Sequence, residues 1–182
     1  MGELRIKGRA LPIVDSAGVP IDDIDTDQIY HNAHLAVTEI SEMGRYAFGN
    51  LKGWQDFPKN VKPCDILLVA RNFGAGSSRQ HAVDCFRALG VGAILGESFG
   101  AIYKRNAINS GFPILEVPSL RSVVLPPGDL IEVDFLSGEI IRVVNGALLA
   151  RAIPFSSVQL DIFRVGGLFA YGKEASLRAK IE

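Results

Sequence analysis

The chain has few of the residues that bind metals or form cross-links. Its 182 residues include only two cysteines and three histidines. Cys64 and Cys85 show no metal-ligand spacing, and two thiolates are too few for an iron–sulfur cluster. The histidines form no metal motif, so we expect no metal bound by this chain alone. The cysteines could pair or stay free, and a reducing compartment favours free buried thiols.

Long apolar runs and an excess of one charge are also missing. No run approaches the roughly 18 apolar residues that a membrane span needs, and the N-terminus lacks a signal-peptide pattern. Lys and Arg number 19 against 20 Asp and Glu, which gives a net charge of −1 without a basic stripe. We therefore expect no membrane or nucleic-acid partner, and a cytoplasmic location.

What the chain does contain is a regular alternation of apolar strands and helical patterns. Buried strands are expected at 66–69, 91–95 and 113–117, after a half-exposed strand at 3–9. The helical patterns between them predict βαβ units and a parallel component. Alternating runs at 129–135 and 139–144 predict a hairpin. Helical stretches after Pro154 and at 168–180 complete one α/β domain over residues 1–182.

The candidate site follows the strand at 66–69. Gly74 and Gly76 form a loop, and Ser77, Ser78 and Arg79 come directly before a helical pattern. Free backbone N–H groups at a helix N-terminus attract anions, and an arginine can bind a carboxylate or phosphate through two N–H groups. The paired glycines also suggest a close approach of the backbone to something. These residues favour an anionic ligand.

The same stretch has a purely structural interpretation. Ser77 followed three residues later by Gln80 is the pattern of a capping box, in which each side chain satisfies a backbone N–H of the other residue. A serine-hydrolase elbow and a Walker loop both fail, because neither Gly-x-Ser-x-Gly nor a lysine after the glycines is present. The capping box and the anion site remain competing accounts of Ser77.

Two other segments could bring groups to this loop. Four aspartates within residues 22–27 form either a polar turn or carboxylates that orient a base or pair with Arg79; the EF-hand pattern fails. Residues 30–57 are irregular, with a short helix expected at 38–48 and capped by Thr38. They are either a mobile loop over the site or a solvated connection. Ser98 is expected to cap the next helix.

Three stretches together carry a resemblance to a known family. They are Asp25-Thr-Asp-Gln-Ile29, Asn72-Phe-Gly-Ala-Gly-Ser-Ser-Arg-Gln-His-Ala82 and Glu97-Ser-Phe-Gly-Ala-Ile-Tyr-Lys-Arg-Asn-Ala-Ile-Asn-Ser-Gly111. In their order and spacing, the chain resembles, nearly end to end, the small swivel-domain subunits of isopropylmalate isomerase and homoaconitase in the aconitase superfamily. The resemblance implies a swivel-type fold and a hydro-lyase. A large partner subunit would hold a [4Fe–4S] cluster that acts as a Lewis acid on a small hydroxy dicarboxylate.

The resemblance also implies roles for single residues. By position, Ser77 is the base that removes a proton α to a carboxylate, and Ser78 and Arg79 bind the substrate. Asp27 would lie near the site and orient a positive group. Arg105 would either contact substrate or make a structural ion pair.

The chain departs from the family pattern in places. Ala75 stands where many relatives have Cys and Gln80 where most have Glu, but neither change removes a proposed catalytic group. Relatives commonly read Pro-Ala-Arg-Tyr-Leu where this chain reads His31-Asn-Ala-His-Leu35. Homoaconitase-type members follow with an Arg that pairs with the extra carboxylate of their substrate. This chain has Ala36 and Val37 there.

The apolar segment Leu35, Ala36 and Val37 would suit the isopropyl group of isopropylmalate and would leave a third carboxylate unpaired. We therefore expect interconversion of 3- and 2-isopropylmalate, as in leucine biosynthesis. Alternatives are a 2,3-dimethylmalate-type or a homoaconitase- or aconitase-type substrate. An alternative of another class is a non-catalytic carboxylate-binding module.

Overall fold

A computed structural model describes residues 4–178, which form one seven-stranded sheet in the order β4-β3-β2-β1-β5-β6-β7. The strands are β1 (Arg5–Pro12), β2 (Ile66–Val69), β3 (Ala93–Gly96), β4 (Ile114–Glu116), β5 (Leu130–Asp134), β6 (Glu139–Arg142) and β7 (Leu148–Arg151). The helices are α1 (Thr26–Ile29), α2 (Ile40–Met43), α3 (Phe57–Asn60), α4 (His81–Ala88), α5 (Ala101–Asn109), α6 (Ser157–Arg164) and α7 (Leu168–Arg178). Single 3-10 turns are η1 (Asn32–His34), η2 (Gly44–Tyr46) and η3 (Leu120–Ser122).

One half of the sheet is parallel, as the alternation of strands and helices predicted. Strands β1 to β4 pair in parallel, with α4 connecting β2 to β3 and α5 connecting β3 to β4. Every residue of β2 and β3 is buried. Both strands read as unbroken apolar runs because both faces of this half are covered.

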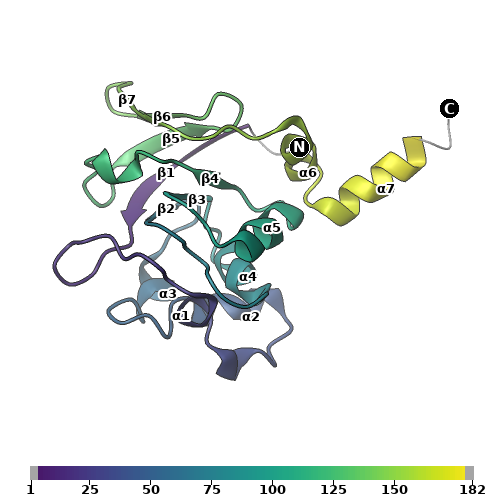
Figure 1. Ribbon diagram of the computed structural model, residues 1–182, viewed down its shortest axis with the longest axis horizontal. Coiled ribbons are helices and arrows are strands. Elements are labelled where there is room, and N and C mark those ends of the chain that lie inside the picture. The colour runs from purple at the N-terminus through teal and green to yellow at the C-terminus, as the bar shows by residue number, and fades with distance from the viewer. Residues whose placement is uncertain (1–3, 179–182) are drawn as a thin grey trace.

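The other half is antiparallel and contains one strand that was not predicted. On its free side β1 pairs antiparallel with β5, then β5 with β6, and β6 with β7. The expected hairpin is therefore confirmed as β5–β6, which lies above the parallel strands in Figure 1. The missed strand, β7, is a four-residue edge strand with no fully buried side chain. It has too little alternation to be recognised.

The core lies on the two faces of the sheet. On one face Leu67 and Val69 pack with aromatic residues from the helical side, such as Phe86. On the other face Ile66 and Leu68 pack with the antiparallel strands and α6. Strands β2 and β3 pair up to their last residues, Val69 with Gly96, so their carboxyl ends lie side by side.

Two local expectations for the middle of the chain are wrong. The helix expected at 38–48 is only α2, continued by η2, and its N-cap residue is Glu39, which makes no capping bond with its side chain. Gly44, where α2 passes into η2, keeps a helical backbone, and a Cβ there would lie 3.0 Å from the side chain of Leu89. Ser98 does not cap α5, because the N-cap residue is Gly100 and the Ser98 hydroxyl instead accepts from the N–H of Asn72.

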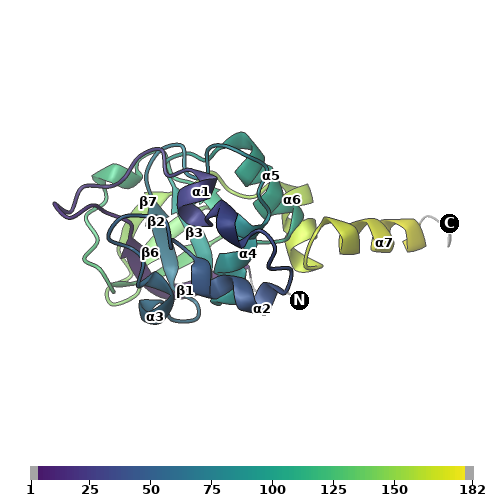
Figure 2. The ribbon, with the colours of Figure 1, turned by 90° about the horizontal axis from the view of Figure 1, so that it is seen from below.

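The chain closes with two helices, as expected after Pro154 and from residue 168. Helix α6 begins with a capping box between Ser156 and Gln159. Helix α7 extends away from the body in both Figure 1 and Figure 2. The last residues of the helix expected to reach 180 lie outside the described residues. Within residues 4–178, no helix is long and apolar enough to cross a membrane.

Candidate active site

The glycine loop is held along one edge by the segment that leads into α1. The N–H of Gly74 donates to the carbonyl of Ile24 at 2.7 Å, and the N–H of Thr26 donates to the carbonyl of Ala75 at 2.8 Å. These bonds place the first residues of α1 beside the end of the loop. The Asp25 stretch and the glycine stretch, about 50 residues apart, are therefore neighbours.

The other edge of the loop is held by the residues that lead into α5. The N–H of Phe73 donates to the carbonyl of Ser98 at 3.1 Å, and the N–H of Gly100 donates to the carbonyl of Phe73 at 2.9 Å. The three stretches that carry the resemblance thus meet at one place.

The two glycines allow this close packing. Gly74 has a φ of +77°, and a Cβ there would lie 2.3 Å from Cγ of Tyr103. Gly76 has a φ of +106°, and a Cβ there would lie 3.2 Å from Oγ1 of Thr26. The expected close approach is confirmed, and the groups approached are Tyr103 and Thr26 of the chain itself.

Ser77 is exposed and does not cap the helix. Helix α4 starts at His81, and its N-cap residue is Gln80, which makes no capping bond with its side chain. The Gln80 amide instead donates forward to Asp84 Oδ1 at 3.2 Å. The capping-box interpretation of Ser77 and Gln80 is therefore wrong. The expected placement of Ser77 at the helix N-terminus is wrong too, because Ser77 lies three residues before the N-cap.

Among residues 4–178, the Ser77 hydroxyl has one side-chain hydrogen-bond partner, which the sequence reasoning overlooked. Oγ of Ser77 lies 3.3 Å from Oγ1 of Thr26. Thr26 is only 2% exposed and opens α1, which Asp25 and Gln28 fix with a capping box. The sequence does place Thr26 between two aspartates, Asp25 and Asp27. A threonine hydroxyl in that stretch could have pointed to this contact.

Arg79 is anchored to α1 through one nitrogen. Its Nη1 donates to the carbonyl of Thr26 at 3.2 Å, to Asp27 Oδ1 at 2.9 Å and to the carbonyl of Tyr30 at 2.5 Å. Within residues 4–178, Nε and Nη2 have no hydrogen-bond acceptor. The pairing of Arg79 with one of the aspartates is confirmed, and two of its nitrogens remain for a ligand.

Asp27 is the centre of a small polar network. Its Oδ1 also accepts from the N–H of Asn32 at 3.0 Å, and its Oδ2 accepts from the amide of Asn50 at 3.0 Å. The hydrogen bond from Arg79 is the largest influence that lowers the pKa of the Asp27 carboxyl; burial opposes it, and the Asn32 N–H and the charges of His31 and Arg79 add to it. Asp27 is therefore ionised at neutral pH.

Ser78 and Arg105 lie at the α5 side of the site. The Asn106 amide donates to the Ser78 hydroxyl at 3.5 Å, and Ser78 is exposed. Arg105 is also exposed, and it makes no ion pair or hydrogen bond with any residue between 4 and 178. The structural ion pair expected as one role of Arg105 is therefore not found among residues 4–178. The other expected role, contact with the substrate, stays a prediction.

The segment expected to choose the substrate is fixed beside the start of α4. Leu35 and Ala36 are exposed, whereas Val37 is half-buried against the helical core. The ring of His81 bonds through Nε2 to the carbonyl of Val37 at 3.1 Å, and the Tyr30 hydroxyl donates to the carbonyl of His34 at 3.2 Å. Leu35 and Ala36 are thus the two side chains of this segment that are open to a ligand.

The cysteines do not offer a metal centre. Both are free thiols, as expected. The expected burial is confirmed for Cys85 and is wrong for Cys64, which is exposed. Burial raises the pKa of the Cys85 thiol. No group of three or more His, Cys, Asp or Glu side chains in the described part of the chain could hold a metal ion. The residues of this chain therefore do not fit a [4Fe–4S] cluster, which needs several thiolates.

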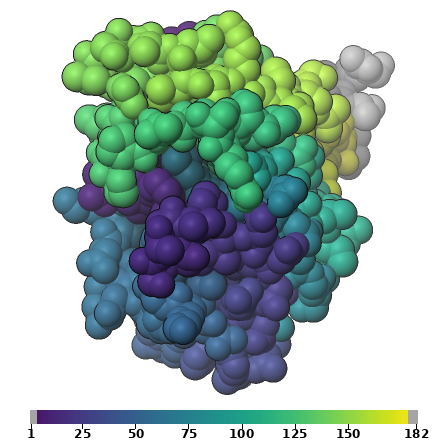
Figure 3. Space-filling view, turned by 60° about the vertical axis from the view of Figure 1, so that its left-hand side comes forward, coloured from purple at the N-terminus to yellow at the C-terminus, as the bar shows by residue number. Residues whose placement is uncertain are grey.

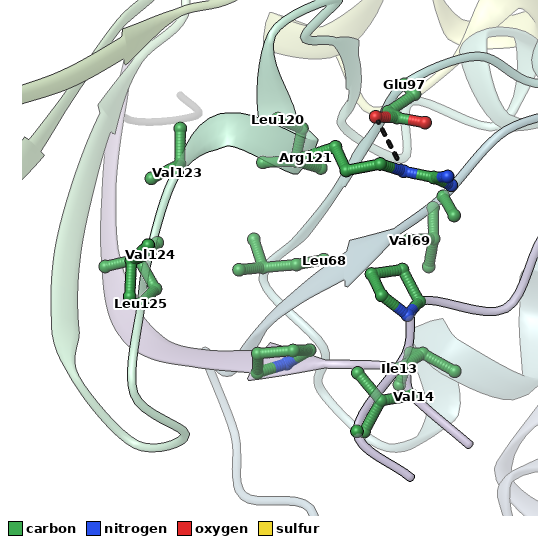
Figure 4. A pocket seen from close by; sticks show the side chains of 14 residues that line it. Ile13, Val14, Leu68, Val69, Glu97, Leu120, Arg121, Val123, Val124 and Leu125 are labelled. Carbon is green, nitrogen blue, oxygen red and sulfur yellow. Dashed lines mark ion pairs between the residues drawn. The ribbon is translucent and has the colours of Figure 1, made fainter.

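An apolar pocket of about 290 Å³ lies at the ends of β1 and β2, and none of the expected site residues lines it. Figure 3 shows a hollow between the purple N-terminal segment and the green segment above it. In Figure 4, Leu68 and Val123–Leu125 line the pocket, and the pair of Glu97 and Arg121, 3.3 Å apart, lies at its rim. This pocket offers no free charge for a carboxylate.

Comparison with known proteins agrees with this arrangement. The model of the aconitase C-terminal domain family matches residues 22–119, which include every expected site residue. The 3-isopropylmalate dehydratase small subunit of Pyrobaculum calidifontis is 38% identical over 168 residues, covering 92% of this chain and 97% of the relative. The isopropylmalate/citramalate isomerase small subunit of Methanocaldococcus jannaschii is 35% identical over 153 residues, covering 84% and 89%.

A crystal structure of 3-isopropylmalate dehydratase from Methanocaldococcus jannaschii has the same fold. It superposes with a TM-score of 0.83 at 30% sequence identity and covers 98% of this chain and 99% of that one. The expected swivel-type α/β fold is thereby confirmed. The chain belongs to the aconitase C-terminal domain family and, within it, to the family of 3-isopropylmalate dehydratase small subunits.

Proposed function

We propose that this chain is the small subunit of a cytoplasmic hydro-lyase that interconverts 3- and 2-isopropylmalate in leucine biosynthesis. A large subunit would complete the site and would carry the [4Fe–4S] cluster that this chain has no ligands to hold. One observation carries the proposal. The exposed Ser77 hydroxyl lies on the same short segment as Arg79, and both contact Thr26 of α1.

Ser77 is the proposed base, which takes the proton from the carbon α to a substrate carboxylate. Ser77 can take that proton only as its alkoxide, so the negative charge on Oγ must be stabilised by nearby donors before the transfer. Uptake of the proton then restores the neutral hydroxyl. Thr26 is well placed to donate to that oxygen, because its own hydroxyl is buried and contacts Ser77.

The open position of Ser77 supports the need for a partner. Ser77 and Ser78 are both exposed in this chain, and hydrogen bonds to a charged oxygen act most strongly where water is excluded. A large subunit seated over this surface would supply that exclusion. The small-subunit names of the relatives support such a partner.

Arg79 is the proposed carboxylate clamp. Its Nη1 is held by Asp27 and two carbonyls, which fixes the plane of the guanidinium, and Nε and Nη2 can then bind one carboxylate side by side. Ser78 would add a hydroxyl to the same carboxylate. Asp27 orients Arg79 and does not touch the substrate in this proposal.

The substrate assignment depends on Leu35 and Ala36. These exposed side chains offer apolar surface to a branched alkyl group and no cation to a third carboxylate, whose burial without a partner is costly. They favour isopropylmalate over homoaconitase- or aconitase-type acids. A 2,3-dimethylmalate-type acid has smaller branches, and a comparison of rates would separate it from isopropylmalate.

Co-expression with the large subunit and an anaerobic assay test this proposal. The pair should convert 3-isopropylmalate to its isomer faster than 2,3-dimethylmalate or homoaconitate. An absence of turnover on every 2- or 3-hydroxy dicarboxylate would refute it. Dicarboxylate binding by the chain alone, with no large subunit retained in a pull-down, would instead establish the non-catalytic carboxylate-binding module.

A further inference from the structure

His31 stands next to the carboxylate that anchors Arg79. Its Nε2 lies 3.9 Å from Oδ2 of Asp27, which is in the first turn of α1. The ring is 39% exposed, so a proton can reach it from solvent. His31 belongs to the segment in which this chain departs from the pattern of its relatives.

The second ring nitrogen of His31, Nδ1, accepts a backbone hydrogen bond. The N–H of Ala33 donates to Nδ1 of His31 at 3.1 Å, and His31 is thereby the N-cap of η1. The neutral ring then carries its proton on Nε2. A doubly protonated ring would lose this cap and would gain attraction to Asp27, so protonation exchanges one contact for the other.

The charges around the clamp give this exchange a consequence. Arg79 and Asp27 together have no net charge, and a neutral pair attracts a dicarboxylate less than a free guanidinium does. A protonated His31 would give the group of three residues one net positive charge. A bound dianion would favour that state in turn, because binding and protonation are linked.

We propose that His31 is a positioning residue that sets the charge of the Arg79 clamp by taking up a proton beside Asp27. The proposal rests on the proposed function, since it concerns the same dicarboxylate site. It predicts that substrate binds more tightly as the pH falls, because a proton on His31 adds a positive charge beside the clamp. The proton transfer to Ser77 is separate from it.

Few charged groups of residues 4–178 face the His31 ring. Those that do are Asp27 from α1 and His34 from η1, whose ring centroid is 6.2 Å from that of His31. Arg79 acts through Asp27, and the side chain that reaches Asp27 from the segment after η2 is the neutral amide of Asn50. His34 is therefore the histidine that a control must address.

The test compares His31→Asn with His34→Phe in the co-expressed pair. An asparagine can keep the N-cap by accepting from the Ala33 N–H, but it cannot take up a proton. The centroids of the His34 and Tyr46 rings lie 3.9 Å apart in a stacked arrangement. His34→Phe retains an aromatic ring for this stack but has no ionisable nitrogen. The KM and kcat for 3-isopropylmalate are measured between about pH 5.5 and 8.5.

In the wild-type pair and in His34→Phe, KM should rise with pH by roughly three- to tenfold, the effect of one nearby charge at a partly exposed site. In His31→Asn, KM should stay at the high value throughout, whereas kcat follows the wild-type profile. An active pair whose KM has the same pH dependence in wild type and His31→Asn would overturn this inference alone. A wild-type pair without turnover would overturn the proposed function and this inference with it.

Discussion

The hydroxyl groups of Ser77 and Thr26 lie 3.3 Å apart, across a junction between the loop before α4 and the first turn of α1. Thr26 is buried and Ser77 is exposed. The buried Thr26 hydroxyl is shielded from water and can direct its proton at Ser77, whereas Ser77 itself is open to water until a partner covers it. This contact gives the proposed base a donor that belongs to the same chain.

Replacement of Thr26 by valine should slow catalysis and leave the fold intact. Valine has nearly the same shape but cannot donate to Ser77 Oγ, so kcat of the pair should fall by about tenfold, the equivalent of one net hydrogen bond. The free energy of unfolding should change by less than about 1 kcal/mol. Steady-state kinetics and urea unfolding measure the two effects. A serine at position 26 should restore most of the rate, and a valine variant with unchanged kcat would show that Thr26 only packs.

Asp27 should make the stability of the chain depend on pH. Its folded-state pKa is lowered, first by the hydrogen bond from Arg79. A carboxyl of this kind stabilises the fold above its unfolded pKa, near 4, and the stabilisation is lost as the pH falls through the folded value. Urea midpoints of wild type and Asp27→Asn should therefore converge as the pH falls from about 5 to 3. If the difference between the two urea midpoints does not change between about pH 5 and 3, Asp27 does not stabilise the fold through its ion pair with Arg79.

The two glycines Gly74 and Gly18 should respond differently to alanine. Both have a positive φ, +77° and +78°, but a Cβ at Gly74 would collide with Tyr103, and a Cβ at Gly18 would meet nothing within 4 Å. Gly74→Ala should cost about 2–5 kcal/mol, from the unfavourable backbone and the collision together. Gly18→Ala should cost only about 1–2 kcal/mol. Equal losses in urea unfolding would mean that Tyr103 moves aside freely.

Leu35 should decide how well the pair distinguishes a branched from a small alkyl group. Truncation in Leu35→Ala should reduce the preference for isopropylmalate over 2,3-dimethylmalate, measured as a ratio of kcat/KM values, by up to about tenfold, because apolar contacts of this size discriminate only weakly. Leu136→Ala is a matched control, because Leu136 is also an exposed leucine and lies in the turn between β5 and β6. The exposed fraction is 51% for Leu136 and 41% for Leu35. If both variants keep the wild-type ratio, Leu35 does not contact the alkyl group.

The fold could be predicted from sequence where buried positions form a recognisable run of apolar residues. The strand at 66–69 was placed to the residue because all four of its side chains are buried. Capping patterns were less reliable. The box between Ser156 and Gln159 forms, whereas the one between Ser77 and Gln80 does not. Both segments have a serine followed three residues later by glutamine. The box fails at Ser77 because helix α4 begins only at His81, beyond the glutamine.

The candidate site could be located from sequence, but its contacts could not. The glycine stretch and its arginine indicated an anion site, and the pairing of Arg79 with Asp27 was among the stated alternatives. The role of Thr26 depends on backbone bonds between segments far apart in the chain, such as that from Thr26 to Ala75. No local pattern contains that information.

The central claim is that Ser77 is the base of a site completed by a large subunit. The most direct test is the turnover of 3-isopropylmalate by the pair that contains Ser77→Ala, with assembly followed by gel filtration. We predict that kcat falls by roughly 10²- to 10⁴-fold, the usual contribution of a positioned acid or base, in a pair that assembles normally. A Ser77→Ala pair that assembles and turns over at the wild-type rate would contradict the account.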